Sequence, residues 1–437
     1  MFLLYTVLRQ MNFFKCYSIV DERSAAYFAL GLSEALNKPV CVSCTSSTAT
    51  CNYMPAVKEA YGRGIELIVL SADRDFRYLY QMEDQMIDQV DMYTGYVKSA
   101  VNLPIVKDYD DRWYCERQVN SALLEMSHGD KGPIQINFQV NNVHNYTVKA
   151  LPEYRKITKY TSLDEESVYE LIKELSSKKR ILVLCGQYCE STKKLSEELE
   201  FFFQHYNVVI SGDYFANLNG DEILRTVLVT EAMENEEFEE FVPDLVISFG
   251  THLWSYIKSK LRYYHGKFEH WSINPTGRVE DGFKSMTKLF EMRPEEFFDS
   301  INMCSNKENS NDKNYYNLWK ERINKVVFPD LGFSNFSAIR DLVELLPDNS
   351  LLHLSVLNSI RLTQYCQSNY PIRCFGNLGA DGIDGAVSTF LGQSSSHDGL
   401  CFLISGDLSF LYDMNPKSRE TCTQIPCPGD SLNLQQL

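Results

Sequence analysis

The sequence alternates short apolar runs with segments of helical periodicity, and this alternation constrains the fold more than any other feature. Apolar runs typical of strands occupy residues 39–44, 65–74 and 132–140. Apolar residues at helical spacing occupy 24–36 and 54–64, and Gly64 ends the second of these segments. Strands that alternate with helices form parallel sheets with helices on both faces. The N-terminal part of the chain is therefore predicted to be an α/β domain.

The same alternation starts again twice. Buried-strand runs at 180–186, 207–213 and 243–250 follow an amphipathic helical pattern, and a third series begins near residue 335. The polar residues 146–162 are predicted to link the first two series, and the polar stretch 305–316 is predicted to be a surface loop. Three successive α/β units also agree with the chain length of 437 residues, at roughly 100–200 residues per domain.

We therefore predict tandem doubly wound parallel-sheet domains of the α/β class, with boundaries at 1–150, 151–333 and 334–437. No strand or helix periodicity follows Asn415. A doubly wound domain needs more chain than this to cover its sheet, so the third domain is expected to be incomplete.

Charge and cysteine content restrict the partners and the compartment. The net charge of −16 argues against nucleic acid or an anionic membrane as the main partner, because both attract basic surfaces. The 13 scattered cysteines do not form a compact disulfide framework and fit a reducing compartment. Residues 1–8 are apolar but too short to span a bilayer and lack the features of a signal peptide. We expect a cytoplasmic protein.

Two C-terminal segments carry possible ligand chemistry. Residues 376–385 place four glycines before a helical pattern, where backbone groups and a helix N-terminus can approach a phosphate. A glycine-rich turn without a ligand explains this segment equally well. The apolar run 399–407 ends in Gly406 and Asp407, at the carboxyl end of a predicted parallel strand. Asp407 could bind Mg²⁺ there, or it could cap the next helix.

Glu22 stands between an apolar segment and the first predicted helix. From this segment alone, an ordinary surface glutamate in the first turn of a helix is the favoured interpretation. A functional role for Glu22 can therefore be predicted only from the order of several motifs along the chain.

Taken together, these motifs resemble a known family. DERSAAYFALGL at 21–32, TSSTATCNYMPAVKEA at 45–60 and DQMIDQV at 84–90 look like a pyrimidine-binding domain, and PDLVISFG at 243–250 looks like a middle domain. The final motifs, LSVLNSIRLTQY, GNLGADGIDG and GDLSFLYDMN, look like the start of a diphosphate-binding domain. This order is similar to that of the menaquinone-pathway thiamine-diphosphate enzymes that synthesise 2-succinyl-5-enolpyruvyl-6-hydroxy-3-cyclohexene-1-carboxylate.

The resemblance implies a reaction and roles for particular residues. The reaction is decarboxylation of 2-oxoglutarate and carboligation to isochorismate, with thiamine diphosphate and Mg²⁺ as cofactors. Glu22 would hydrogen-bond the aminopyrimidine ring, and Gln85 would lie near the reacting carbons. Arg361 would contact a substrate carboxylate. The remaining implied cofactor contacts are Ile383 beneath the bent cofactor, Gly406, Asp407 as Mg²⁺ ligand, and Ser409.

The resemblance also implies a homodimer or homotetramer, because two subunits build each site in this family. Its small-molecule partners would be a 2-oxoacid and an acidic acceptor. Four departures matter. Residues 1–18 lack the family's first strand and its serine-proline-glycine-serine-arginine loop. Asn433 lies near the expected distance of the second metal ligand, but its sequence has no strand context. Leu378 replaces a substrate-binding arginine, and Tyr256 and Ile257 replace a Lys-Arg pair.

The first two departures suggest losses at both ends of the chain, and the other two suggest a diverged substrate pocket. Two alternatives therefore stay open beside the synthase. One is a related thiamine-diphosphate decarboxylase or carboligase with another substrate, and the other is an inactive fragment.

Overall fold

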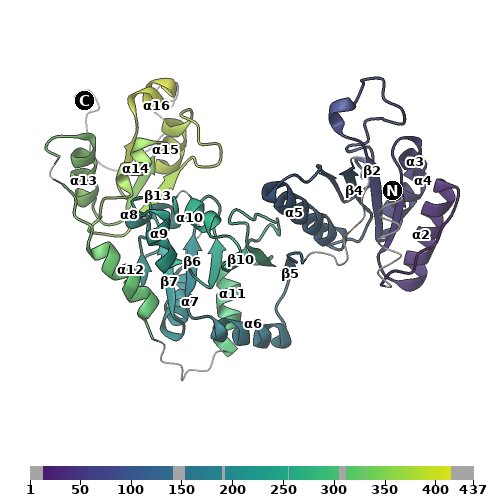
Figure 1. Cartoon of the computed structure of the whole chain (residues 1–437). Helices are drawn as coiled ribbons and strands as arrows, with labels where there is room; N and C mark the ends of the chain where they lie inside the picture. The colour runs from purple at the N-terminus through teal and green to yellow at the C-terminus, as the bar shows by residue number, and fades with distance from the viewer. Residues whose placement is uncertain are drawn as a thin grey trace. The chain divides into compact units, whose positions relative to one another are not determined.

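A computed structural model describes residues 13–140, 153–188, 192–253, 255–304, 312–329 and 331–414. The chain divides into two compact units, Met1–Ile157 and Thr158–Leu437, and each is described here by itself. Parallel strands covered by helices make up both units (Figure 1). The predicted α/β class with tandem parallel sheets is confirmed.

The first unit contains a four-stranded parallel sheet in the order β1-β2-β4-β3. Its strands are β1 (Val40–Cys44), β2 (Leu67–Asp73), β3 (Ser99–Leu103) and β4 (Ile134–Gln139). Its helices are α2 (Glu22–Leu36), α3 (Thr48–Cys51), α4 (Met54–Arg63), η1 (Phe76–Tyr78) and α5 (Tyr109–Met126). Gly64 ends α4 with a φ of 65°, a conformation that glycine adopts without steric cost.

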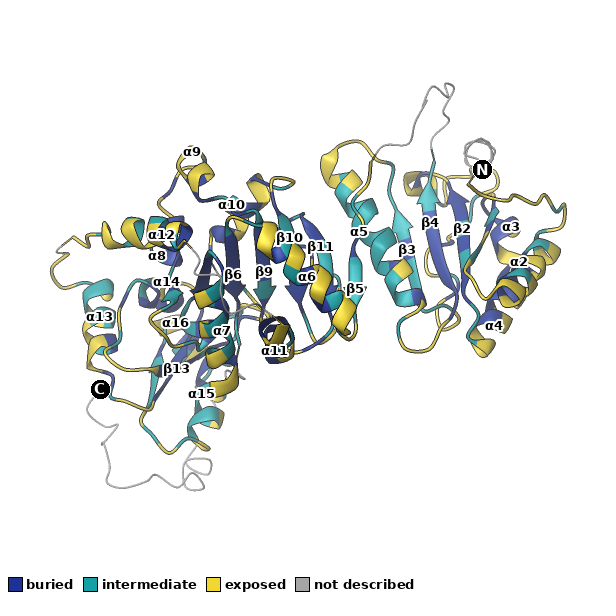
Figure 2. Ribbon diagram, turned by 90° about the horizontal axis from the view of Figure 1, so that it is seen from below, coloured by how far each residue is buried: buried dark blue, intermediate teal, exposed yellow. Residues whose placement is uncertain are grey.

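Two apolar layers cover this sheet. Ala26, Ala29 and Leu30 of α2 pack with residues of α4 and with Val42, Leu67 and Val69 of the strands. A second cluster joins Ala122 and Met126 of α5 to strands β3 and β4. Buried and intermediate residues follow the strands in Figure 2. Because apolar side chains cover both faces of the sheet, polar functional groups are expected on the loops at the ends of the strands.

The second unit is built on a seven-stranded parallel sheet in the order β5-β11-β10-β9-β6-β7-β8. Its strands are β5 (Thr158–Tyr160), β6 (Ile181–Cys185), β7 (Val208–Gly212), β8 (Ile223–Leu224), β9 (Leu245–Phe249), β10 (Glu269–Ile273) and β11 (Met286–Phe290). The helices around it are α6 (Glu165–Ser177), α7 (Lys193–His205), η2 (Tyr214–Ala216), α8 (Val227–Thr230), α9 (Asn235–Phe238), η3 (Glu239–Phe241), α10 (Ile257–Tyr263), α11 (Pro294–Cys304) and α12 (Asn314–Asn324).

Alternate residues of its central strand enter different cores. Ile181, Val183 and Cys185 of β6 pack in one apolar cluster, and Leu182 and Leu184 pack in another. All five residues are buried, as expected for a strand in the middle of a parallel sheet with helices on both faces.

A three-stranded parallel sheet in the order β13-β12-β14 completes the second unit. Its strands are β12 (Ser350–Leu354), β13 (Ile372–Gly376) and β14 (Cys401–Ile404), and its helices are α13 (Asn335–Leu345), α14 (Asn358–Thr363), α15 (Ala386–Ser394) and α16 (Asp407–Tyr412). Asn217 joins this part to the larger sheet, because its carboxamide donates to the Cys374 carbonyl at 3.0 Å and accepts from the Cys374 amide at 2.7 Å. Helices α15 and α16 lie together above the larger sheet in Figure 1.

Two local predictions were wrong. The predicted linker 146–162 contains β5, which pairs with β11 at the edge of the seven-stranded sheet. The predicted surface loop 305–316 contains the start of α12, where Tyr315 and Tyr316 are buried. The predicted domain boundaries at 150 and 333 stay predictions, and Asn433 lies outside the described residues.

Candidate active site

Glu22 is the first residue of α2, and its side chain is half-buried. The helix starts here because Asp21 caps it, accepting a hydrogen bond from the Ser24 amide at 2.7 Å. Burial raises the pKa of the Cys44 thiol to about 11, and the nearby charge of Glu22 adds to this rise. Burial also raises the pKa of Tyr53, again with a contribution from Glu22. Glu22 therefore lies close to the carboxyl end of β1 and to the start of α4.

The Glu22 carboxylate makes no hydrogen bond or ion pair with any residue that the structure describes. A half-buried carboxylate usually has such a partner, because desolvation without one is unfavourable. An unpaired group at this position is suited to bind a polar ligand group.

Gln85 lies in the segment between η1 and β3, and its side chain is exposed. Its φ is 54°, an uncommon value for a residue other than glycine. Its carbonyl accepts a hydrogen bond from the Ser46 hydroxyl at 2.9 Å. Because Ser46 follows β1 by two residues, Gln85 and Glu22 both lie around the carboxyl end of that strand.

A buried polar network lies beside Gln85. Gln89 is fully buried, and its carboxamide nitrogen donates to the Ala72 carbonyl at 2.9 Å and to Asn137 at 2.8 Å. Asn137 also donates to Asp73 at 2.9 Å. Burial raises the pKa of Asp73, while the hydrogen bond from Asn137 opposes this rise. The network connects the carboxyl ends of β2 and β4 to the segment that carries Gln85.

The second group of predicted residues gathers at the carboxyl end of the three-stranded sheet. Gly406 precedes α16, and its amide donates to the Ser355 hydroxyl at 3.3 Å. Asp407 is exposed, and its Oδ1 accepts from the Leu408 amide at 2.8 Å. Ser409 is buried and donates to the Ile383 carbonyl at 2.7 Å. The structure therefore brings Ile383, Gly406, Asp407 and Ser409 together.

This arrangement leaves room for a ligand and a cation. A Cβ at Gly406 would meet nothing within 4 Å, so the backbone there faces open space. No described residue binds the second oxygen of Asp407. Mg²⁺ is commonly held by one or two carboxylates together with phosphate oxygens, and Asp407 can supply one of them. The described residues contain no cluster of three or more candidate metal-binding side chains.

Arg361 lies on α14, exposed, and it forms no ion pair within the described ranges. A serine pair connects its helix to the same sheet end, because Ser355 and Ser359 are hydrogen-bonded at 3.2 Å and Ser355 also binds Gly406. Leu378 packs in the apolar core of this part, and Tyr256 is 41% exposed beside α10.

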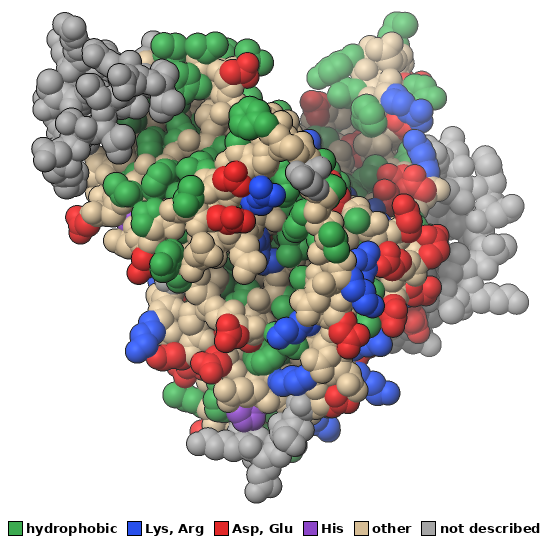
Figure 3. All heavy atoms as spheres, turned by 90° about the vertical axis from the view of Figure 1, so that its left-hand side faces the viewer, with side chains coloured by type: hydrophobic (Ala, Val, Ile, Leu, Met, Phe, Trp, Pro, Cys, Tyr) green, Lys and Arg blue, Asp and Glu red, His purple; other side chains and the backbone are tan. Residues whose placement is uncertain are grey.

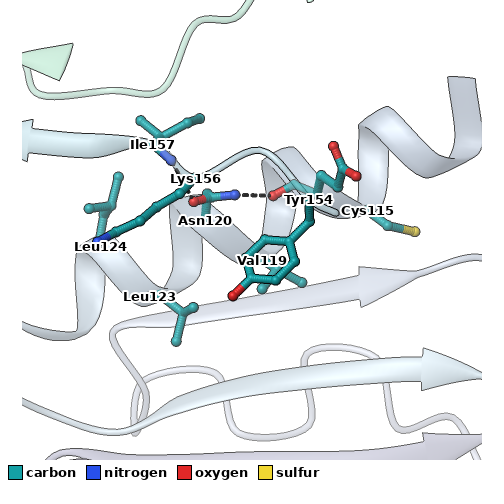
Figure 4. A pocket seen from close by; sticks show the side chains of 9 residues that line it. Cys115, Val119, Asn120, Leu123, Leu124, Tyr154, Lys156 and Ile157 are labelled. Atoms are coloured by element: carbon teal, nitrogen blue, oxygen red, sulfur yellow. Dashed lines mark hydrogen bonds between the residues drawn. The ribbon is translucent and has the colours of Figure 1, made fainter. Parts of the chain in front are cut away.

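A separate cavity of about 460 Å³ lies on α5 (Figure 4). Mostly apolar side chains line it, including Val119 and Leu123, and Asn120 holds the chain there through hydrogen bonds with Arg155 and Ile157. None of the predicted site residues borders this cavity. The chemistry therefore points to the sheet ends rather than to this cavity.

Three residues of the site were not predicted from the sequence, namely Ser46, Gln89 and Ser355. The motif DQMIDQV contains two glutamines four residues apart, and this spacing was the available signal for Gln89. The serines had no such signal, because Gln85 lies 39 residues from Ser46 and Gly406 lies 51 residues from Ser355.

Comparison with known proteins defines the class first. The family described as "Thiamine pyrophosphate enzyme, N-terminal TPP binding domain" matches residues 1–92, which include Glu22 and Gln85. With the parallel α/β fold, this match indicates a thiamine-diphosphate-dependent enzyme, and curated relatives establish this class over 92% of the chain.

Curated relatives then give the family. The 2-succinyl-5-enolpyruvyl-6-hydroxy-3-cyclohexene-1-carboxylate synthase of Bacteroides thetaiotaomicron is 36% identical over 414 residues, which cover 92% of this chain and 72% of that protein. The synthase of Bacteroides fragilis is 35% identical, with 92% and 73% covered, and that of Flavobacterium johnsoniae is 33% identical, with the same shares. The chain belongs to this synthase family, which confirms the predicted resemblance.

Among solved structures, benzoylformate decarboxylase from Polynucleobacter necessarius matches with a TM-score of 0.38 and 14% identity, covering 90% of this chain and 73% of that one. The family assignment rests on the sequence relatives. Within the described residues, no helix is long and apolar enough to cross a membrane.

Proposed function

We propose that this chain catalyses the reaction of its family, the thiamine-diphosphate-dependent decarboxylation of 2-oxoglutarate and carboligation to isochorismate in menaquinone biosynthesis. The observation that carries the proposal is the half-buried, unpaired Glu22 carboxylate at the carboxyl end of β1. Thiamine diphosphate, when bound, supplies a nucleophilic carbon for such carboligation. The protein's own residues would bind the cofactor, orient the reacting groups and exchange protons with them.

Glu22 would hold a proton between its carboxylate and a ring nitrogen of the cofactor. Gln85, whose backbone Ser46 holds, would orient the reacting groups beside it. In the second unit, Asp407 would bind Mg²⁺, with Gly406 and Ser409 beside the diphosphate. Ile383, 37% exposed, would support the cofactor from below. Arg361, exposed and unpaired in the described structure, would bind a substrate carboxylate.

We also propose a homodimer as the minimum active assembly, with a homotetramer as an extension of it. Exposed apolar side chains beside both groups of residues support this. Tyr27 and Phe28 are exposed on α2 near Glu22, and Leu408 and Tyr412 are exposed on α16 near Asp407. Hydrophobic side chains also reach the surface between acidic and basic ones on the face shown in Figure 3. A second subunit would cover such side chains.

A cytoplasmic location is proposed on chemical grounds. Every cysteine in the described residues is a free thiol, which suits a reducing compartment. The acidic net charge of −16 supports small-molecule partners rather than nucleic acid or an anionic membrane.

A second candidate function keeps the same cofactor but uses a less acidic acceptor. Leu378 supports it, because this side chain is buried in an apolar core and offers no positive charge to a substrate. Screening 2-oxoglutarate with isochorismate and with uncharged acceptors would distinguish the two functions by product analysis.

The test is calorimetric titration of the full chain with thiamine diphosphate, with and without Mg²⁺. We expect binding that requires Mg²⁺ and that is lost in Asp407→Asn. Glu22→Gln should keep binding but lower kcat by about 10²–10⁴-fold, the usual contribution of a positioned acid–base group. Glu34→Gln on the same helix is the matched control, because Glu34 is exposed and pairs with Arg63. A folded wild type that binds no thiamine diphosphate would contradict the proposal.

A further inference from the structure

Gln89 is a fully buried glutamine that the proposed chemistry does not use. Its side chain forms three hydrogen bonds to separate parts of the first unit. The nitrogen donates to the Ala72 carbonyl at 2.9 Å and to Asn137 at 2.8 Å, and the oxygen accepts from the Ser47 amide at 3.0 Å. Its backbone carbonyl accepts from Gln135 at 3.2 Å. One residue therefore connects β2, β4 and the turn after β1.

The turn after β1 donates a second hydrogen bond to the segment that carries Gln85 and Gln89. Ser46 donates from its hydroxyl to the Gln85 carbonyl at 2.9 Å, while Ser47 donates from its amide to Gln89. Two hydrogen bonds thus join residues 46–47 to residues 85–89, one donated by a side chain and one by the backbone of the turn. We name these two hydrogen-bonded pairs, Ser46 with Gln85 and Ser47 with Gln89, the Ser46–Gln89 clamp.

Ser47 shows that the clamp holds an unfavourable conformation. Its φ is 74° and its ψ is −130°, a region that residues with a Cβ rarely adopt. Gln85 also has a positive φ of 54°. Such conformations persist where surrounding contacts determine them, and they gather at functional sites.

The neighbouring chain shows what lies outside the clamp. Just before Gln85, Tyr80 is 82% exposed and Met82 is fully exposed. After it, Gln89 and Tyr93 are buried, and the Tyr93 hydroxyl donates to the Thr50 carbonyl. The buried part of the segment is therefore fastened to the sheet end next to Glu22 by buried hydrogen bonds. The part before it is held there by the exposed ion pair between Glu83 and Arg74, at 3.7 Å.

We propose that Gln89 is a positioning residue that, through the Ser46–Gln89 clamp, fixes Gln85 relative to Glu22 at the carboxyl end of β1. This rests on the proposed function for the role of Gln85, whereas the clamp itself rests on the hydrogen bonds above. Gln89 would act through Gln85 and touch no substrate. A small displacement of such a group can lower the rate strongly without weakening binding.

The main test is Gln89→Met in the full chain, since methionine has a similar length and forms none of the three side-chain hydrogen bonds. Hydrogen–deuterium exchange of peptides covering residues 79–96 should become at least about 10-fold faster, as expected for local opening. With 2-oxoglutarate as substrate, kcat should fall by about 10–100-fold. KM and the Kd of thiamine diphosphate should change by less than about 3-fold, because Gln89 contacts neither the substrate nor the cofactor in this proposal.

Two further variants keep the test decisive. Ser46→Ala removes only the bond to Gln85 and should move exchange and kcat in the same direction by about 3–10-fold, even where Gln89→Met does not fold. Asn120→Ala is the control, because Asn120 binds the Glu116 and Arg155 carbonyls in the same unit without touching the clamp. It should leave exchange of residues 79–96 and kcat unchanged.

Unchanged exchange in residues 79–96 in both clamp variants would overturn the clamp. Faster exchange with unchanged kcat would overturn the positioning role. A wild type that binds thiamine diphosphate but does not consume 2-oxoglutarate would contradict the proposed function, and exchange alone would then decide whether the clamp exists.

Discussion

The four-stranded sheet of the first unit and the seven-stranded sheet of the second unit share parallel topology but bury different side chains. In the smaller sheet, Ser71 on β2 and Gln135 and Asn137 on β4 are polar and almost completely inaccessible. In the larger sheet, the central strand β6 buries Ile, Leu, Val, Leu and Cys. Its neighbours contribute few polar contacts, such as Ser211 with Thr226 at 2.7 Å.

The two sheets therefore have different tasks, since one positions a particular segment and the other contributes stability. Buried polar groups must be hydrogen-bonded, and such networks determine one specific arrangement of the chain. In the first unit the network ends at Gln89 and so at the segment that carries Gln85. The apolar sheet instead contributes stability through packing, and it positions the three-stranded sheet through contacts such as Asn217 with Cys374. We therefore expect core variants to change stability first and network variants to change local order.

The largest expected effect is in the apolar sheet. Phe298 of α11 is fully buried and contacts the rings of Phe202, Phe249 and Phe297. Phe298→Ala should lower the free energy of unfolding of the second unit by about 3–5 kcal/mol, because it removes buried contacts and leaves a cavity. Urea unfolding followed by the fluorescence of the buried Trp271 and Trp319 would measure it. The control Phe76→Ala changes a 65% exposed ring and should change stability by less than about 0.5 kcal/mol.

A network variant should have a smaller and more local effect. The Asn137 carboxamide makes four hydrogen bonds, accepting from Ser71 and Gln89 and donating to Asp73 and Asn102. Asn137→Ala leaves buried groups without partners and should cost about 1–3 kcal/mol. Faster hydrogen–deuterium exchange in β2 and β4, with the second unit unchanged, would show it. Asn102→Ala removes one of the four bonds, and an equal effect there would show that Asn137 is not the centre of the network.

The same difference explains how much of the fold could be predicted. The runs 65–74, 180–186 and 243–250 match β2, β6 and β9, because a strand covered on both faces needs a continuous apolar sequence. Strand β5 has the sequence Thr-Lys-Tyr and forms at a sheet edge by pairing with β11. Three partly polar residues carry no periodic signal, so this strand was assigned to a linker.

The motifs predicted the residues of the candidate site but not the hydrogen bonds that position them. Glu22, Gln85 and Asp407 come from motif order, and their roles stay predictions. The spacing of the two glutamines marked Gln89 but could not predict its partners, because Ser47 and Asn137 lie 42 and 48 residues away. Hydrogen bonds at such separations depend on the register of β2 with β4, which one sequence does not specify.

The smallest expected effect tests whether a half-buried carboxylate is unfavourable at the end of the apolar sheet. Asp213 follows β7, and its side chain accepts from the Phe215 amide at 2.9 Å. Burial raises the pKa of Asp213 from 3.8 to about 6, although the Phe215 amide and Arg225 oppose this rise. The folded state therefore binds the proton more tightly than the unfolded state. The resulting stability is present below about pH 4 and is lost as the pH rises through about 6.

Asp213→Asn keeps the cap and removes the charge, so it should stabilise the second unit at pH 8 and have little effect at pH 4. A shift of this size corresponds to about 3 kcal/mol, and partial exposure of the side chain reduces the expected gain to about 1 kcal/mol. Asp164→Asn at the cap of α6 is the opposite control, because the Ser167 hydrogen bonds lower the pKa of Asp164. That variant should be less stable than wild type at pH 8. Urea unfolding at both pH values measures the two variants, and a loss of stability at pH 8 in Asp213→Asn would show that Asp213 acts as a favourable partner of Arg225.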